Sequence, residues 1–214
     1  MALMELKQQV CEKALEAYRT GLFEGTCGNL SVIDRASGRV VITPSCLPYE
    51  DYTPEDMVVI DLNGDVVEGR HKPSSEWIMH TMVYREKPEV GSVIHTHSSY
   101  ATAFAVRGVD IPAVLMEMIP TLGGSVRLAP FGMPGTDEVG RRAVEALAGG
   151  RGGCLLAYHG VLAVGTTLEQ ALMRAGYVEN AAKIYTLALS TGAVNPIPDE
   201  LAEQIRRHYA EASK

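Results

Sequence analysis

The 214-residue sequence has no long uninterrupted apolar run, no excess of basic residues and no closely spaced cysteine pair. A membrane-spanning helix needs about 18 or more consecutive apolar residues, so the first absence predicts that no segment crosses a membrane. Charged residues within 1–18 also interrupt the apolar stretch that a signal peptide requires. Together these absences predict a cytoplasmic protein.

The charge balance excludes a general nucleic-acid binder. Acidic residues outnumber basic ones by 26 to 19, which gives a formal net charge of -7. A protein that binds nucleic acid needs a basic surface to displace counterions from the phosphates. A small anionic ligand that is held locally stays compatible with this composition.

The cysteine spacing and the overall composition predict one globular domain without disulfides. Widely spaced cysteines in a chain of this size indicate free thiols rather than a disulfide framework; they are Cys11, Cys27, Cys46 and Cys154. Apolar residues make up 46% of the chain and charged residues 21%, as in ordinary soluble proteins. No repeat or linker divides the chain, so we expect residues 1–214 to form a single domain.

Helical and strand patterns follow one another irregularly. The expected helices cover residues 1–18, 74–86, 98–106, 136–147, 167–189 and 199–210. The expected strands cover residues 30–33, 40–43, 57–62, 91–96, 154–158 and 161–164. Ser74 or Ser75 is expected to cap the second helix, and Thr167 with Gln170 to form a capping box. This order, without strict strand–helix–strand alternation, predicts an α/β/α layered fold around a mixed sheet.

Two histidines end the strand expected over residues 91–96. His95 and His97 are two positions apart, so a strand directs both imidazoles to one face, where they can bind one metal ion. The pair alone is equally compatible with a polar strand face. His159, where a buried strand turns, favours a metal, because three imidazoles leave one position open on a tetrahedral ion, as in catalytic zinc sites. The other histidines are expected in structural or solvated positions: His71, His80 and His208.

Three polar segments have the chemistry of an anion cradle. Ser74 and Ser75 offer hydroxyls and free N–H groups at a helix start, with Glu76 following in the first turn. Taken alone, these residues are more typical of an ordinary serine cap. Segment 25–31 offers glycines for close backbone approach with Asn29 beside them, and segment 43–46 is a further candidate turn. The sequence contains neither a P-loop nor a dinucleotide fingerprint.

In combination these motifs resemble a known family. They are Gly25-Thr26-x-Gly28-Asn29-x-Ser31, Ile42-Thr43-Pro44-Ser45, Pro73-Ser74-Ser75-Glu76, His95-x-His97 and His159-Gly160. In this order and approximate spacing, and over nearly its whole length, the chain resembles the class II aldolase/adducin family and, within it, the L-fuculose-1-phosphate aldolase branch. The combination is specific although each motif is weak.

The resemblance implies a fold, a metal site and an assembly. The fold is a three-layer α/β/α sandwich with a mixed, largely antiparallel central sheet, in a homotetramer whose active sites lie at subunit interfaces. Zn²⁺, or Mn²⁺ or Co²⁺ in its place, would be bound by His95, His97 and His159, with Glu76 completing the resting coordination and leaving when the substrate arrives. A sugar phosphate would be held by Gly28, Asn29, Ser45, Cys46, Ser74 and Ser75. Catalytic roles are implied for Glu76, which takes the C4 hydroxyl proton, and for Tyr209, which matches a tyrosine that covers the site.

The reaction implied is retro-aldol cleavage of a ketose 1-phosphate to dihydroxyacetone phosphate and an aldehyde. Residues 111–120 lack the tyrosine with which fuculose-1-phosphate aldolases assist the aldehyde oxygen, and carry soft apolar groups instead. This departure favours 5-deoxyribulose 1-phosphate or 5-(methylthio)ribulose 1-phosphate, salvage substrates from S-adenosylmethionine chemistry, although the same side chains are equally typical of an intersubunit core.

Other members of the superfamily remain alternatives. They are an L-fuculose-1-phosphate aldolase, a methylthioribulose-1-phosphate dehydratase and a pentulose-phosphate 4-epimerase. In the epimerase branch an aspartate typically stands at the position of Glu76, so the glutamate favours an aldolase. A non-enzymatic alternative is an adducin-like scaffold, against which the intact histidines and Glu76 argue.

Overall fold

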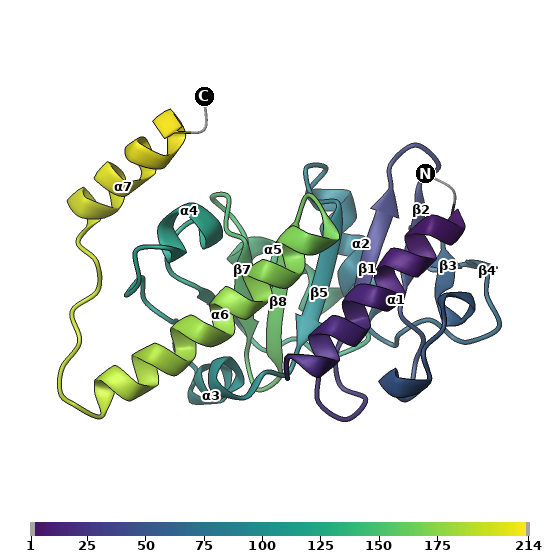
Figure 1. Ribbon diagram of the computed structural model, residues 1–214, viewed down its shortest axis with the longest axis horizontal. Helices are drawn as coiled ribbons and strands as arrows, with labels where there is room; N and C mark the ends of the chain where they lie inside the picture. Colours follow the sequence, from purple (N-terminus) through teal and green to yellow (C-terminus); the bar gives the residue numbers. More distant parts are fainter. Residues whose placement is uncertain (1–2, 213–214) are drawn as a thin grey trace.

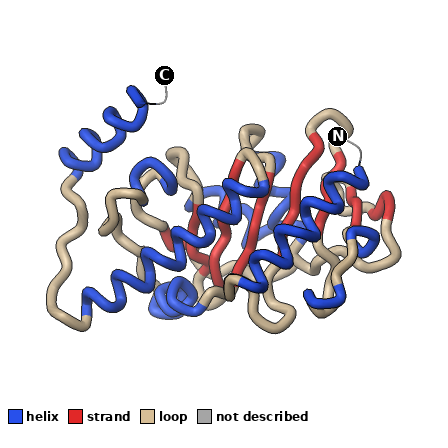
Figure 2. Tube along the Cα trace, in the orientation of Figure 1, coloured by secondary structure: helices blue, strands red, loops and turns tan. Residues whose placement is uncertain are grey.

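A single sheet of eight strands forms the centre of the computed structural model, which describes residues 3–212 (Figures 1 and 2). The strands are β1 (Asn29–Asp34), β2 (Arg39–Ile42), β3 (Val58–Ile60), β4 (Val66–Glu68), β5 (Ser92–Thr96), β6 (Arg127–Ala129), β7 (Gly153–Leu156) and β8 (Gly160–Gly165). Their order in the sheet is β4-β3-β2-β1-β5-β8-β7-β6. Neighbouring strands run antiparallel except β6 and β7, which are parallel. The mixed, largely antiparallel sheet is therefore confirmed.

Helices cover both faces of this sheet, which gives the expected three layers (Figure 1). One face is covered by α1 (Leu3–Arg19), α3 (Ser99–Arg107), α4 (Met118–Leu122) and α6 (Leu168–Leu189). The other face is covered by α2 (Trp77–Glu86) and α5 (Asp137–Ala146). Two short 3-10 helices, η1 (Tyr49–Asp51) and η2 (Pro54–Asp56), lie between β2 and β3. The last helix, α7 (Asp199–Ala212), contacts α4 and extends away from the sheet.

The side chains of β5 alternate between the two faces of the sheet. On β5, Val93 packs in the core beneath α2 and α5, whereas Ile94 packs in the core beneath α1 and α6. Successive strand residues point to opposite faces, so His95 lies on the same face as Val93. The alternation therefore directs His95 toward the side of the sheet that α2 covers.

Two helix starts differ from the expected caps. The residue that caps α2 is Glu76, so the expectation of Ser74 or Ser75 at this position is wrong, as is that of Glu76 within the first turn. The Ser74 hydroxyl instead accepts a hydrogen bond from the Glu76 amide at 3.3 Å, which forms a turn before the helix. At α6, Thr167 caps the helix as expected, but the Gln170 side chain reaches Thr166 rather than Thr167.

Three short elements, two of them the outermost strands of the sheet, are absent from the sequence-based expectations. They are β4, β6 and α4, of three, three and five residues. A segment of three to five residues is too short to show a helical or strand period in its apolar residues. Residues 1–2 of the first expected helix lie outside the described residues. The four cysteines are free thiols, as expected, and no helix among residues 3–212 is long and apolar enough to cross a membrane.

Gly160 opens β8 directly against β5, and we expect Gly160→Ala to destabilise the fold. A Cβ at this position would lie 2.4 Å from the backbone oxygen of Thr96 and 3.2 Å from His95 Cε1. Overpacking of this kind lowers the free energy of unfolding by about 1–3 kcal/mol, which urea unfolding measures. Gly176→Ala is the matched control, because its Cβ meets nothing within 4 Å in α6. Equal stability of the two variants would contradict the close approach of β8 to β5.

Candidate active site

Four strand ends meet at one edge of the sheet. β1 begins at this edge, β2 and β5 end there, and β8 begins there, because each strand runs antiparallel to its neighbour. Asn29 at the start of β1 is paired with His95 near the end of β5, and His95 is paired with Leu162 of β8. The polar segments that flank these strand ends are thereby gathered at one place.

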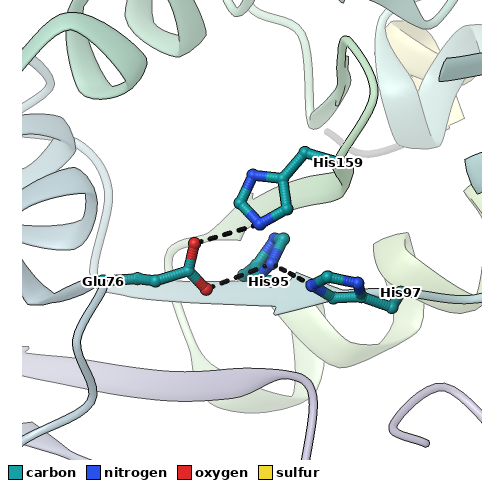
Figure 3. Close-up of side chains that lie close together, drawn as sticks. All are labelled: Glu76, His95, His97 and His159. Atoms are coloured by element: carbon teal, nitrogen blue, oxygen red, sulfur yellow. Dashed lines mark hydrogen bonds and ion pairs between the residues drawn. The ribbon is translucent and has the colours of Figure 1, made fainter. Parts of the chain in front are cut away.

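The segment before α2 is held at the same edge. The Ser74 amide donates to the carbonyl of Thr43 at 3.0 Å, and Pro44 and Pro73 form an isolated β-bridge. These contacts fix residues 72–75 beside the end of β2. Glu76, which follows directly, extends its side chain toward the end of β5 and the start of β8 (Figure 3).

Glu76 and three histidines converge at this edge (Figure 3). One ligand atom from each of Glu76, His95, His97 and His159 lies within 4.8 Å of the others. Glu76 Oε2 is 3.2 Å from His95 Nε2, and Glu76 Oε1 is 3.2 Å from His159 Nε2. His95 Nε2 is also 2.9 Å from His97 Nε2. The structure thus brings together the four residues that the sequence predicts as metal ligands.

The donor atoms of this cluster fit a bound metal ion. His95 Nδ1 lies 2.8 Å from the carbonyl of Val161, which only accepts, so Nδ1 carries the proton and Nε2 presents a lone pair to the cluster. Among residues 3–212, Glu76 Oε1 is buried without a hydrogen-bond partner, and it faces His159 Nε2 at 3.2 Å. Lone pairs and a carboxylate that converge in this way need a positive charge between them, which a divalent cation supplies.

Burial and mutual contact set the charges of these groups. Burial lowers the pKa of His95 to about 4 and also lowers the pKa of His97, so both rings are neutral near pH 7. Burial by itself would raise the pKa of Glu76, but His95, His159 and Asn29 together hold it well below its usual range. The cluster therefore combines the neutral imidazoles of His95 and His97 with a carboxylate anion, the protonation states in which these groups bind metals.

The residues predicted to bind phosphate lie at the same edge but differ in exposure. Asn29 and Ser74 are buried, Gly28 and Ser45 are partly exposed, and Cys46 and Ser75 are exposed. Gly28 has a φ of +120°, and a Cβ on it would lie 2.3 Å from Phe23, so the close approach requires glycine. Their role in binding phosphate stays a prediction.

Asn29 has a contact that the sequence did not indicate. Its side-chain amide donates to Glu76 Oε2 at 2.8 Å, and the side chain is 5% exposed. Forty-seven residues separate the two positions. Only the pairing of β1 with β5, together with the placement of α2, brings them together.

Tyr209 lies apart from Glu76 within the described chain. It is on α7, which contacts α4, and it lines a surface hollow with Ile119, Pro120 and Gly149. Its side chain is 39% exposed. The predicted catalytic role of Tyr209 therefore depends on a second copy of the chain and stays a prediction.

The other histidines lie in structural or exposed positions, as expected, and His80 in addition contacts the cluster through Asn29. His71 Nε2 lies 2.7 Å from the buried Asp56 carboxylate, and His208 is exposed on α7. His80 is fully buried and hydrogen-bonds to Asn29 and Ser31. In the sequence, the one indication that His80 is connected to the cluster is that it follows Glu76 by one helical turn.

Comparison with known proteins decides the family. Residues 8–186 match the model of the class II aldolase and adducin N-terminal domain. The chain belongs to the class II aldolase and adducin family. It is 35% identical over 209 residues to 5-deoxy-D-ribulose 1-phosphate aldolase of Bacillus thuringiensis serovar kurstaki, over 98% of this chain and 97% of that protein. It is 38% identical over 204 residues to 5-methylthioribulose-1-phosphate/5-deoxyribulose-1-phosphate aldolase of Rhodospirillum rubrum, over 95% and 90% of the two chains.

A solved structure has the same fold. L-fuculose 1-phosphate aldolase superposes with a TM-score of 0.91 at 38% identity, over 96% of each chain. With relatives of this similarity over nearly the full length, the protein is a class II aldolase, a lyase that cleaves a carbon–carbon bond. The three-layer fold that the resemblance implied is confirmed.

We expect a divalent metal to stabilise the folded protein through His97. After treatment with a chelator, Zn²⁺ at 100 times its dissociation constant should raise the free energy of unfolding by about 2.7 kcal/mol, visible as a higher midpoint of thermal unfolding. His97→Ala should lose this increase, because one ligand is removed, whereas His208→Ala on exposed α7 should keep it. An unchanged increase in His97→Ala would remove His97 from the ligand set.

Proposed function

We propose that the protein is a Zn²⁺-dependent aldolase that cleaves 5-deoxyribulose 1-phosphate or 5-(methylthio)ribulose 1-phosphate. The products are dihydroxyacetone phosphate and either acetaldehyde or (methylthio)acetaldehyde. The observation that carries the proposal is the convergence of Glu76 and three histidines beside segments rich in amides and hydroxyls. The names of the Bacillus and Rhodospirillum relatives support these substrates.

Zn²⁺ is the proposed metal because three imidazoles suit its tetrahedral coordination, which Glu76 would complete at rest and open by leaving when the substrate arrives. Mn²⁺ and Co²⁺ are alternatives that accept the same donors. When bound, the cation supplies a Lewis acid that stabilises the negative charge developing on the three-carbon fragment. This stabilisation lowers the barrier to breaking the C3–C4 bond.

Glu76 is the proposed base of the reaction. Its side chain is 13% exposed and its carboxylate is ionised, so it can accept a proton in a site largely screened from water. As the C4 hydroxyl loses its proton, the C4–O bond becomes the carbonyl of the aldehyde and the C3–C4 electron pair passes to the three-carbon fragment. That fragment then takes a proton at C3 and leaves as dihydroxyacetone phosphate. Asn29 donates to Oε2 only, so Oε1 is the proposed acceptor.

The phosphate is proposed to bind to amides and hydroxyls rather than to a basic patch. The proposed residues are Gly28, Asn29, Ser45, Cys46, Ser74 and Ser75. The bridge between Pro44 and Pro73 joins the segments of Ser45 and Ser74, and Asn29 contacts Glu76 of the metal cluster. A cradle of this kind needs no surplus of basic residues, and a net charge of -7 is compatible with it.

Residues 111–120 are proposed to contact the aldehyde end of the substrate from an adjacent subunit. Met116 in this segment is 52% exposed, whereas Met118 and Ile119 are buried. A thioether surface suits a methyl or methylthio group better than a hydroxyl. L-fuculose 1-phosphate is the second candidate substrate, favoured by the close structural similarity to the aldolase of that name.

A homotetramer with active sites at its interfaces is the proposed assembly. Exposed apolar side chains gather on the last turns of α6, at Ile184, Leu187 and Leu189, and α7 extends beyond α4. Apolar surface of this kind supports burial against another subunit. We also propose a cytoplasmic location and a role in salvage of by-products of S-adenosylmethionine chemistry.

We expect the enzyme to release dihydroxyacetone phosphate from the two 5-substituted pentulose 1-phosphates faster than from L-fuculose 1-phosphate. A coupled dehydrogenase assay measures this in a panel that also contains rhamnulose and ribulose 1-phosphates. Glu76→Gln should lower kcat by about 10²–10⁴-fold, as for loss of a general base. Glu145→Gln, an exposed change of equal charge on α5, should leave kcat unchanged.

The products separate the alternatives. A diketo phosphate without triose phosphate would indicate a dehydratase, and an epimeric pentulose phosphate alone would indicate an epimerase. Failure to cleave any member of the panel with metal bound would indicate a non-catalytic scaffold. Near-normal turnover by Glu76→Gln would remove Glu76 from the mechanism.

We expect Tyr209 to act at the active site of a neighbouring subunit. Tyr209→Phe should lower kcat, and mixing this variant with inactive Glu76→Gln subunits should restore activity. In the mixed assembly, an intact Glu76 from one subunit meets an intact Tyr209 from another. Reassembled Glu76→Gln alone and Tyr209→Phe alone are the controls. No gain on mixing would show that Tyr209 does not act between subunits.

A further inference from the structure

A chain of buried hydrogen bonds leads from Glu76 into the core beneath α2. Glu76 Oε2 is 2.8 Å from Asn29 Nδ2, and Asn29 Oδ1 is 2.6 Å from His80 Nε2. His80 Nδ1 is 2.7 Å from Ser31 Oγ, which is 2.7 Å from the Tyr84 hydroxyl. Asn29, Ser31, His80 and Tyr84 are all buried. The chain thus connects the proposed base to groups remote from solvent.

Two periodicities place these residues opposite one another. Asn29 and Ser31 are two apart on β1, so they point to the same face of the sheet. Glu76, His80 and Tyr84 are spaced by four at the start of and along α2, so they lie on one face of the helix. Each polar group on the strand thereby meets a polar group on the helix.

The Asn29 amide fixes the direction of the hydrogen bonds. Its NH₂ group donates to Glu76 Oε2, so its oxygen, which only accepts, faces His80. His80 must then donate from Nε2 and accept at Nδ1, where Ser31 donates. The Ser31 oxygen can in turn accept from the Tyr84 hydroxyl. Each hydrogen bond of the chain thus joins one donor to one acceptor.

The other tautomer of His80 would break this arrangement. With its proton on Nδ1, His80 would present a lone pair to the Asn29 oxygen across 2.6 Å. Rotation of the Asn29 amide would relieve that repulsion but would direct the same oxygen at the Glu76 carboxylate. Either outcome leaves two acceptors facing each other in a buried site, which is costly. Burial also lowers the pKa of His80 to about 3, so the ring is neutral.

We propose that His80 is a positioning residue for Glu76. By donating from Nε2, it holds the Asn29 amide with its NH₂ group toward Glu76 Oε2, and so fixes the carboxylate relative to His95 and His159. The inference rests on the proposed role of Glu76 as the base. It also leaves the second N–H of Asn29 available for the substrate phosphate.

Two substitutions of His80 separate its two hydrogen bonds. His80→Gln places a side-chain N–H donor the same number of bonds from the backbone as Nε2, so it can still hold Asn29. His80→Asn has its polar atoms at the position of Nδ1, so it can still meet Ser31 but not Asn29. We expect kcat to fall by about 10–100-fold in His80→Asn and by much less in His80→Gln.

Tyr84→Phe controls for a loss of stability alone. It removes the far end of the chain and leaves the bonds among His80, Asn29 and Glu76 in place. We expect a lower midpoint of thermal unfolding with kcat retained. If kcat instead follows the midpoint across all three variants, or if His80→Asn keeps wild-type kcat, His80 has a structural role only and the proposal is wrong.

The tautomer of His80 is a readout that does not depend on activity. Solid-state ¹⁵N NMR of the Zn²⁺-loaded wild type, with the signal assigned by its absence in His80→Gln, should show a neutral ring protonated at Nε2. A ring protonated at Nδ1 would overturn the proposal even if His80→Asn does not fold. A wild type that cleaves no ketose phosphate would contradict the proposed function, whereas the tautomer would still report on the hydrogen-bond chain.

Discussion

The active site depends on the antiparallel pairing of β2, β1, β5 and β8. This pairing places the start of β1, the ends of β2 and β5 and the start of β8 at one edge of the sheet. A parallel arrangement of the same strands would send Asn29 and His95 to opposite edges. Close packing at Gly160 keeps His159 next to this edge. The register of four strands thus decides which polar side chains meet, and the remaining chemistry follows from their proximity.

The charges at the metal site are set by neighbouring groups and not by the net charge of the chain. Burial keeps His95 and His97 neutral, while neighbouring groups keep Glu76 ionised, so the cluster favours a cation. Asn29, which bonds to His80, satisfies one carboxylate oxygen and leaves the other facing His159. Backbone amides and hydroxyls beside the metal site can hold an anion without a basic surface. Net charge therefore describes the exterior and says little about what the site binds.

Much of the site was predictable, since short motifs carry local chemistry. The spacing of His95 and His97 on a strand, and the position of His159 at a turn, indicated metal ligands that the structure brings together. The cap of α2 was misplaced by one or two residues, because the Ser74 hydroxyl accepts from the amide of Glu76 in a turn before the helix, and the Ser74 amide bonds to Thr43 after β2. The outer strands β4 and β6 and the helix α4 were missed because each is too short to show a period.

The sequence by itself determined the ligand types, the family and the layered fold, since these depend on residue identity and on periods within single elements. Only the tertiary structure decided that Asn29 holds Glu76, that His80 faces Asn29 from α2, and that Tyr209 lies away from its own cluster. The contacts of Asn29 join positions up to 51 residues apart in the sequence. The distance of Tyr209 from Glu76 likewise cannot be read from the sequence. Strand register and helix placement set such distances, and both arise from packing across the whole chain rather than from any local segment.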